Sequence, residues 1–137
     1  MGNNIFIDTS GFYALLVKRD NMHEKAKNIL QHAVENKIIF TTTDYILDET
    51  VTLLQARGLS FIIKDLFDVV FNSKACTIEW MDQERFTSTR LFFLKHIAQL
   101  RSFTDCFSFL VMKELKQESV LTKDNHFQEV GFKALLV

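Results

Sequence analysis

Short apolar runs alternate with longer segments of helical periodicity along the whole chain, and this alternation limits the fold more than any other feature. The first such run, residues 5–8, precedes a short helix-like segment. Residues 22–37 then carry apolar side chains at helical spacing before a second strand-like run at 38–42. Strands that alternate with helices are typical of βαβ units, in which the strands pair in parallel. We therefore predict an α/β fold.

Capping and turn residues set the ends of the predicted elements. Gly58 is expected just after the end of one helix, because glycine readily adopts the left-handed backbone conformation found there. The predicted strands are residues 5–8, 38–42, 76–80, 119–122 and 133–137. The predicted helices are a short one through 12–16, then 22–37, 44–57, 60–72 with Ser60 as its cap, 82–100 with Asp82 as its cap, one that Ser102 or Thr104 caps and that ends near 117, and a helical turn at 125–130.

The composition indicates one ordinary folded domain, residues 1–137, and excludes several classes of protein. Hydrophobic residues make up 47% and charged residues 24%, which is too apolar for a disordered chain. No apolar run approaches the roughly 18 uncharged residues of a membrane span, and Asp8 interrupts the first apolar run, unlike a signal peptide. Two cysteines make no disulfide framework, so we expect a cytoplasmic protein. The net charge of −1 gives no general attraction to nucleic acids, so such a contact needs a local patch or a metal.

Two of the predicted strands end on a carboxylate accompanied by hydroxyl groups. Asp8 follows an apolar strand and precedes Thr9 and Ser10, and Asp124 ends the stretch "SVLTKD". Either aspartate alone is most simply interpreted as a helix cap or a turn residue. In a parallel sheet, however, both would lie at the carboxyl edge, where open α/β sheets bind their ligands.

The adjacent acids Asp48 and Glu49 are separated by the geometry of the helix that carries them. Asp48 shares a polar stripe with Asp44 and Thr52, which is expected to face water. Glu49 instead shares a stripe with apolar residues, among them Tyr45, which is expected to face the core. A carboxylate on that stripe is costly unless it is paired, protonated or bound to a metal, although a partly exposed boundary position is the simpler alternative.

Asp105 lies in the first turn of an otherwise apolar helix. An acid is favourable beside a helix N-terminus, and Ser102 three residues earlier resembles a capping box, so a structural role is one interpretation. Phe103, Cys106 and Phe107 indicate that this helix begins in the protein interior. The other interpretation is therefore that a cation holds the carboxylate there.

Carboxylates that converge on one site repel one another and cannot all stay ionised without compensation. A hard divalent cation supplies it, and a ligand set of oxygen atoms alone favours Mg²⁺ or Mn²⁺ over Zn²⁺. The four histidines are scattered without zinc-ligand spacing and are expected to be surface or boundary residues: His23, His32, His96 and His126. Cys76 and Cys106 are expected to be small core residues.

Five stretches in this order resemble the signature blocks of the PIN-domain ribonucleases, and especially the VapC-like toxins of bacterial toxin–antitoxin pairs. They are "FIDTSGFYALL", "YILDET", "FTDCFSF", "VLTKDNHF" and "GFKAL". Each stretch alone is a weak signal, but the ordered set covers nearly the whole chain and is specific. The resemblance implies a PIN-like three-layer α/β/α sandwich with a central parallel five-stranded sheet, whose first and fourth strands are neighbours. That order would place Asp8 beside Asp124.

The resemblance also implies a site and an activity. The implied catalytic and metal-binding residues are Asp8, Glu49, Asp105 and Asp124, with Thr9 or Ser10 as hydroxyl support. The implied enzyme is a Mg²⁺- or Mn²⁺-dependent endoribonuclease that hydrolyses phosphodiester bonds of RNA, and single-stranded RNA suits an open cleft. Asp8 and Asp105 are the expected direct ligands, whereas the other two acids would ligate directly or through water.

The implied partners are a cognate antitoxin protein and a second copy of the chain. The chain contains 14 phenylalanines, several of them in helices whose apolar content exceeds what one face of a sheet requires. Large exposed apolar patches usually mark interfaces, so we expect a homodimer built largely from the helices of residues 60–100. The residues of interest are Phe61, Phe67, Phe71, Phe92 and Phe93.

Other functions fit the residues less well or stay open. An aspartate-nucleophile phosphatase needs a second aspartate where Ser10 stands, and a receiver-type signalling domain needs paired acids after the first strand. A catalytically silent PIN-like module that binds RNA or protein stays open as the alternative. It also stays open whether the basic residues nearest the motifs contact phosphates or only form a solvated face: Lys123, Arg101, Lys18 and Arg19.

Overall fold

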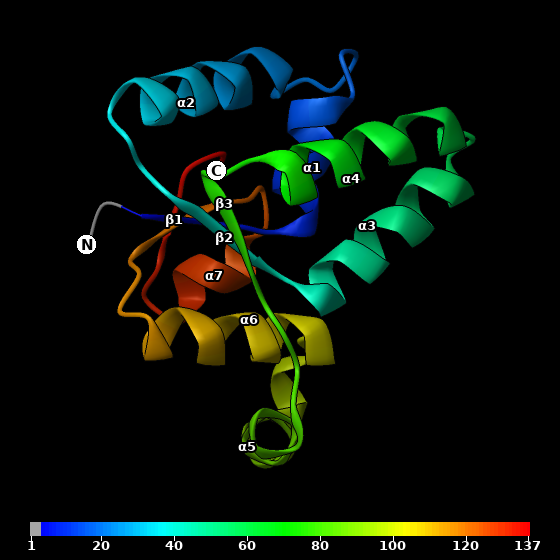
Figure 1. The fold of residues 1–137 in the computed structure, drawn as a ribbon. Helices are drawn as coiled ribbons and strands as arrows, with labels where there is room; N and C mark the ends of the chain where they lie inside the picture. Colours follow the sequence, from blue (N-terminus) through cyan, green and yellow to red (C-terminus); the bar gives the residue numbers. More distant parts are fainter. Residues whose placement is uncertain (1–3) are drawn as a thin grey trace.

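A five-stranded, entirely parallel sheet forms the centre of the protein, as seen in a computed structural model that describes residues 4–137 (Figure 1). The strands are β1 (Ile5–Ile7), β2 (Phe40–Thr43), β3 (Cys76–Glu79), β4 (Ser119–Leu121) and β5 (Lys133–Ala134). Their order across the sheet is β3-β2-β1-β4-β5, so β1 is central and pairs with β4. This order confirms the predicted sheet and the predicted adjacency of the first and fourth strands.

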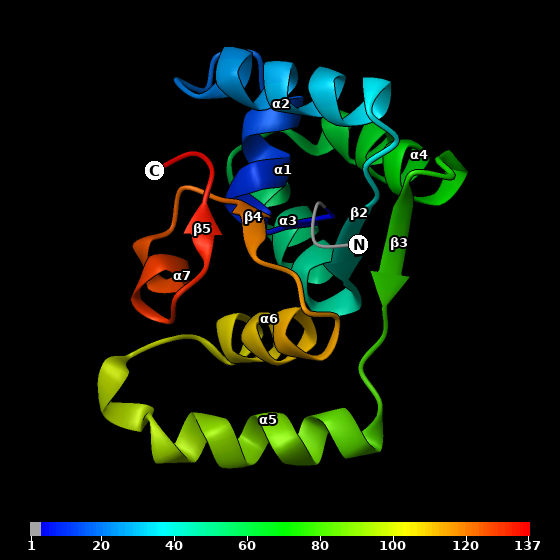
Figure 2. The ribbon, with the colours of Figure 1, turned by 90° about the vertical axis from the view of Figure 1, so that its left-hand side faces the viewer.

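Helices cover both faces of the sheet. They are α1 (Thr9–Leu16), α2 (His23–Glu35), α3 (Asp44–Ala56), α4 (Ile63–Asn72), α5 (Gln83–Lys95), α6 (Phe103–Glu114) and α7 (Asn125–Glu129). Helices α1, α2 and α4 lie on one side and α6 on the other, while α5 lies outside α6 and forms an arm at the edge of the molecule (Figure 2). The predicted three-layer α/β/α arrangement is therefore confirmed.

Side-chain caps begin several of these helices where the sequence predicts them. Asp82 Oδ1 accepts a hydrogen bond from the Arg85 backbone N–H at 2.7 Å, which begins α5. Ser102, and not Thr104, caps α6, because Ser102 Oγ accepts from the Asp105 N–H at 2.9 Å. Gly58 follows the end of α3 with a φ of 72°, as a C′ glycine should.

Several predicted elements differ in their extent. The segment expected to begin with Ser60 as a cap starts instead as a 3₁₀ turn, Ser60–Ile62, without a side-chain capping bond. The helix expected over 82–100 ends at Lys95, and a second 3₁₀ turn, Ile97–Gln99, leads to a left-handed Leu100 with a φ of 56°. This break reverses the chain so that α6 can pack against α5. The last strand is shorter than expected and spans only Lys133–Ala134.

Part of the core lies where α1 packs against the central strands. All three residues of β1 are buried. Gly11 lies so close to β4 that a Cβ atom there would stand 2.1 Å from the backbone oxygen of Leu121. Only glycine allows this approach, and it keeps the start of α1 beside the end of β4. Among residues 4–137, no helix is both long and apolar enough to cross a lipid bilayer.

Candidate active site

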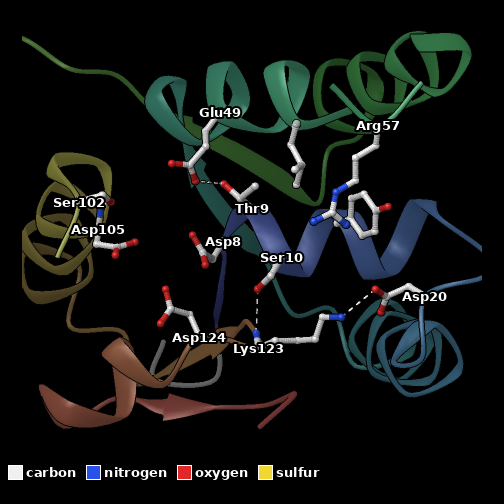
Figure 3. Close-up of a pocket in the computed structure, with 12 residues that line it drawn as sticks. Asp8, Thr9, Ser10, Asp20, Glu49, Arg57, Ser102, Asp105, Lys123 and Asp124 are labelled. Atoms are coloured by element: carbon white, nitrogen blue, oxygen red, sulfur yellow. Dashed lines mark hydrogen bonds and ion pairs between the residues drawn. The ribbon is translucent and has the colours of Figure 1, made fainter. Parts of the chain in front are cut away.

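A cleft of about 450 Å³ lies at the carboxyl edge of the sheet. Its lining comes from the ends of β1 and β4, from α1 and α3, and from the first turn of α6 (Figure 3). The lining includes all four acids that the sequence nominates: Asp8, Glu49, Asp105 and Asp124. Their side chains approach one another from three sides, so the structure brings the predicted set together in one place.

Asp8 lies deepest in the cleft, directly after β1, and is only 4% exposed. One carboxylate oxygen, Oδ2, accepts a hydrogen bond from the Thr122 hydroxyl at 2.8 Å. The other oxygen, Oδ1, is buried without a hydrogen-bond partner among the residues that the structure describes. Burial raises the pKa of Asp8 to about 7; the Thr122 hydrogen bond lowers it, and the neighbouring charges of Asp105 and Glu49 raise it further.

Asp105 faces Asp8 from the first turn of α6 and is 7% exposed. Its Oδ2 lies 3.2 Å from Nδ1 of His126. Burial raises the pKa of Asp105 above its ordinary value, although the hydrogen bond from His126 opposes the shift. The nearby carboxylate of Asp124 raises that pKa further. The first turn of α6 therefore holds a buried acid, and a cation in the cleft would stabilise its ionised form.

Asp124 is half-buried between β4 and α7, where it caps α7 by accepting a hydrogen bond from the His126 backbone N–H at 2.8 Å. The same Oδ1 atom is 3.4 Å from Nδ1 of the His126 ring. Ligand atoms from Asp105, Asp124 and His126 all lie within 4.8 Å of one another. These three residues have the spacing of a metal-binding group.

Glu49 enters the cleft from α3 and is held by a hydrogen bond from the Thr9 hydroxyl. The predicted difference between Glu49 and Asp48 is present, since Asp48 is exposed and does not line the cleft. However, the apolar stripe of α3 that we expected to face the core, with Tyr45 and Glu49 on it, is not its core face. The core face of α3 is formed by Ile46, Leu47, Thr50 and Leu54, whereas Glu49 is half-buried beside it and faces the cleft.

Two hydroxyl groups link the loops that carry Asp8 and Asp124. The Ser10 hydroxyl lies 3.0 Å from the Thr122 hydroxyl and accepts a hydrogen bond from the Lys123 backbone N–H at 2.8 Å. Thr122 Oγ1 in turn accepts from the Asp124 N–H at 3.0 Å. The two hydroxyl groups predicted to support the site therefore have different partners: Thr9 contacts Glu49, and Ser10 contacts the residues that follow β4.

Several side chains at the site, among them His126 and Arg57, were not predicted from the sequence. His126 is a partly exposed boundary residue, as expected, but its contacts with two of the acids were not predicted. Its place two residues after Asp124, in a predicted helical turn, was the available signal. Arg57, the C-cap of the helix that carries Glu49, also lines the cleft and was not predicted.

The basic residues that lie nearest the motifs have different surroundings. Lys123 lines the cleft and donates to Asp20 at 2.7 Å. Burial acts to raise the pKa of Asp20, but the hydrogen bonds from Lys123 and a backbone N–H outweigh it, so the pKa lies below its ordinary value. Arg101 is largely buried and pairs with Glu129 at 3.2 Å, outside the cleft. Lys18 and Arg19 are exposed and are not part of the cleft lining.

The residues present fit a hard divalent cation. The orphaned Oδ1 of Asp8 is the strongest indication, because a buried carboxylate oxygen without a donor is costly and a cation removes that cost. The other acids add oxygen ligands from separate elements, which is the donor set that Mg²⁺ and Mn²⁺ prefer. An acidic cleft of this kind is suited to chemistry on phosphate esters.

The parallel sheet and its acidic cleft together define a class of protein. Residues 5–133 match the PIN domain, and the chain belongs to the PIN domain family. Among solved structures, it is similar to VapC20 of Mycobacterium tuberculosis, described as a toxin that cleaves the sarcin–ricin loop, with 25% sequence identity and a TM-score of 0.81. The match covers 94% of this chain and 96% of VapC20. A comparison with curated proteins finds no match. The predicted resemblance to VapC-like PIN-domain proteins is confirmed.

Proposed function

We propose that the chain is a metal-dependent endoribonuclease and the toxin of a type II toxin–antitoxin system. The observation that carries this proposal is the buried, unpartnered Oδ1 of Asp8, which faces further acids in the cleft of a PIN-family fold. The likeness to VapC20, a toxin that cleaves RNA, supports RNA as the substrate. Single-stranded RNA fits best, because its backbone can enter an open cleft without a second strand.

Four residues would hold the cation. Asp8 and Asp105 would be direct ligands, since their burial leaves their charge with the least solvent compensation. Glu49 and Asp124 are less buried and would ligate directly or through water. When bound, one or two Mg²⁺ or Mn²⁺ ions would activate a water molecule and stabilise the charge that develops on the phosphate and the leaving oxygen.

The remaining polar residues would keep the acids in position. Thr122 holds Oδ2 of Asp8, and Oδ1 has no partner among the described residues and would be left for the cation. Thr9 holds Glu49 across the gap between α1 and α3. His126 joins α6 to α7 by contacting both Asp105 and Asp124, so the acids of these two helices keep a constant spacing.

Cleavage of labelled single-stranded RNA tests the proposal. We expect cleavage by the purified chain in Mg²⁺ or Mn²⁺, and none when EDTA removes the metal. The Asp8→Asn variant, purified in the same way, is the control against a contaminating nuclease, because it should lose the activity that the matched Asp48→Asn variant keeps. RNA binding without cleavage in either metal would favour the alternative, a catalytically silent PIN-like module.

The partners are a further part of the proposal. Phe61, Phe67 and Phe71 on and beside α4 are 76%, 41% and 56% exposed. Phe92 and Phe93 instead pack inward, with their rings 6.4 Å from Phe109 and 5.6 Å from Phe103. The exposed apolar side chains of residues 60–100 would form a homodimer interface, and an antitoxin segment would cover the acidic cleft.

Two measurements test these partners separately. Light scattering at micromolar concentration should give the mass of a dimer, and a monomer would refute that part of the proposal. The antitoxin is tested by cleavage assays with the protein encoded beside this chain. Undiminished cleavage in the presence of the bound neighbour would refute its inhibitory role without bearing on the ribonuclease activity.

A further inference from the structure

The cleft has a second, basic end that the acids do not account for. Opposite the carboxylates, its wall carries Arg57 from the end of α3 and Lys123 from the end of β4, with Asp20 beside them (Figure 3). The acidic end and the basic end belong to the same cleft, which has a volume of about 450 Å³. An RNA strand bound at the acids would therefore extend past these cations.

The two cations differ in how they are compensated. Lys123 Nζ donates to Asp20 at 2.7 Å and to the side-chain oxygen of Asn21 at 3.2 Å. Within residues 4–137, Arg57 makes no ion pair with a carboxylate, and its guanidinium carbon lies 4.9 Å from the centre of the Tyr13 ring. An aromatic ring attracts a cation through its face and leaves the edge N–H groups of the guanidinium free to donate.

The contact with Tyr13 restrains the Arg57 side chain but does not pair its positive charge with a carboxylate. A long exposed side chain usually loses rotamer freedom when it binds a ligand, which weakens binding. The Tyr13 ring already restrains the guanidinium, so less freedom is lost. The free fork of N–H donors matches two oxygens of a phosphate and can bind them in bidentate fashion.

A phosphate-binding residue at this end would offset the repulsion between the acidic site and the negatively charged RNA. The net charge of the chain is −1, and four carboxylates line the opposite end, so RNA receives no general attraction. A cation that makes no ion pair within the described residues, a short distance along the same cleft, supplies local attraction where the strand leaves the acids.

We propose that Arg57, held against Tyr13, binds an RNA phosphate next to the cleaved linkage and sets how the strand lies in the cleft. The inference rests on the proposed ribonuclease function and adds to it a substrate-binding residue that acts apart from the metal. Its contribution is to binding of the RNA chain and not to the chemical step.

Fluorescence anisotropy with a labelled 12-nucleotide single-stranded RNA tests this role directly. Every protein carries Asp8→Asn and the buffer contains EDTA, so the RNA stays intact and no metal contributes. Arg57→Met should weaken binding about tenfold. It should also lower the slope of log affinity against log salt by about 0.7, the value for one phosphate contact on a single strand.

Matched variants separate charge, geometry and ring. Arg57→Lys should keep the salt slope but recover only part of the affinity, because an ammonium lacks the bidentate fork. Tyr13→Leu should weaken binding less than Arg57→Met does, and Tyr13→Phe should leave it unchanged. Arg90→Met is the control, since Arg90 is exposed on α5 and does not line the cleft.

The outcomes distinguish this inference from the proposed function. Equal affinity and equal salt slope for the Arg57→Met and Arg90→Met proteins, with normal folding by circular dichroism, would overturn the inference. An arginine that serves a partner protein instead of RNA would give that result. The ribonuclease function would still stand if the unchanged chain cleaves RNA in Mg²⁺ or Mn²⁺, and it would fall if the chain neither binds nor cleaves RNA.

Discussion

The ends of β1 and β4 have similar local sequences but hold their carboxylates in different ways. Each short apolar strand is followed by an aspartate at the N-cap position of a helix. Asp124 uses its carboxylate as a cap, with Oδ1 accepting from the His126 N–H at 2.8 Å. Asp8 makes no side-chain capping bond to its helix, and its Oδ1 has no hydrogen-bond partner in the described part of the chain.

The difference shows that Asp124 stabilises the fold in addition to lining the cleft, whereas Asp8 lines the cleft at a cost to the fold. The end of β1 lies in the middle of the sheet, so Asp8 is 4% exposed, whereas Asp124 near the side of the sheet is half-buried. A capping carboxylate gains hydrogen bonds on folding and stabilises the protein. A buried carboxylate with a free oxygen destabilises the metal-free fold, and such a cost is typical of a functional site.

The largest expected effect concerns catalysis at the buried acids. Asp8→Asn and Asp105→Asn should each abolish RNA cleavage or reduce it by about 10³-fold, because removal of one charge-stabilising group commonly costs about 10²- to 10³-fold even when no metal ligand is lost. Initial rates in Mg²⁺ and Mn²⁺ measure this. A folded variant that cleaves at the rate of the unchanged chain would show that the substituted residue has no catalytic role.

Asp48 and Glu49 are adjacent acids on α3 that differ in their surroundings, as Asp8 and Asp124 do. Glu49→Gln should lower cleavage about ten- to hundredfold, the loss expected for a group that orients or indirectly supports metal ligands. Asp48→Asn should leave the rate unchanged, because Asp48 is exposed outside the cleft. Equal losses from the two substitutions would contradict the assignment of Glu49.

Local signals in the sequence were sufficient for most of the fold. Strand and helix positions follow from periodicity, and the ends at Gly58, Asp82 and Ser102 follow from capping chemistry, which acts over three or four residues. The strand order came from the resemblance to PIN domains, since pairing between β1 and β4 joins residues far apart in the chain.

Features that depend on distant contacts could not be predicted from the sequence. His126 reaches Asp105 on α6, and Arg57 reaches Tyr13 on α1, across elements whose relative placement no local pattern specifies. The break at Leu100 also depends on distant contacts. Leu100 adopts a left-handed backbone conformation that favours glycine, and this turn lets α6 pack against α5. Local sequence also did not reveal that Asp8 is buried more deeply than Asp124.

The burial of Asp8 should make the stability of the metal-free protein depend on pH. Its pKa is about 7 in the fold and 3.8 when unfolded, so between these values the folded state binds more protons. The free energy of unfolding should therefore fall as the pH rises from about 4 to 7. Asp8→Asn should remove the share of this fall that Asp8 causes and stabilise the protein at pH 8 by roughly 4 kcal/mol, with little difference near pH 4. The raised pKa of Asp105 should leave a smaller fall in the variant. Urea denaturation in EDTA at several pH values measures it, and parallel curves for the two proteins would contradict the assignment.

The smallest expected effect tests the opposite behaviour of Asp124. Asp124→Ala should destabilise the metal-free protein by about 1 kcal/mol, because the backbone N–H of His126 loses its capping partner. Asp124→Asn keeps a capping oxygen and should be nearly neutral. Denaturation at pH 8 in EDTA, under the conditions used for Asp8→Asn, makes the two strand ends directly comparable. The expected changes have opposite signs, because at β1 the substitution removes a buried charge and at β4 it removes a hydrogen bond. Stabilisation by Asp124→Ala would mean that repulsion among the acids outweighs the cap, and the two strand ends would then differ only in degree.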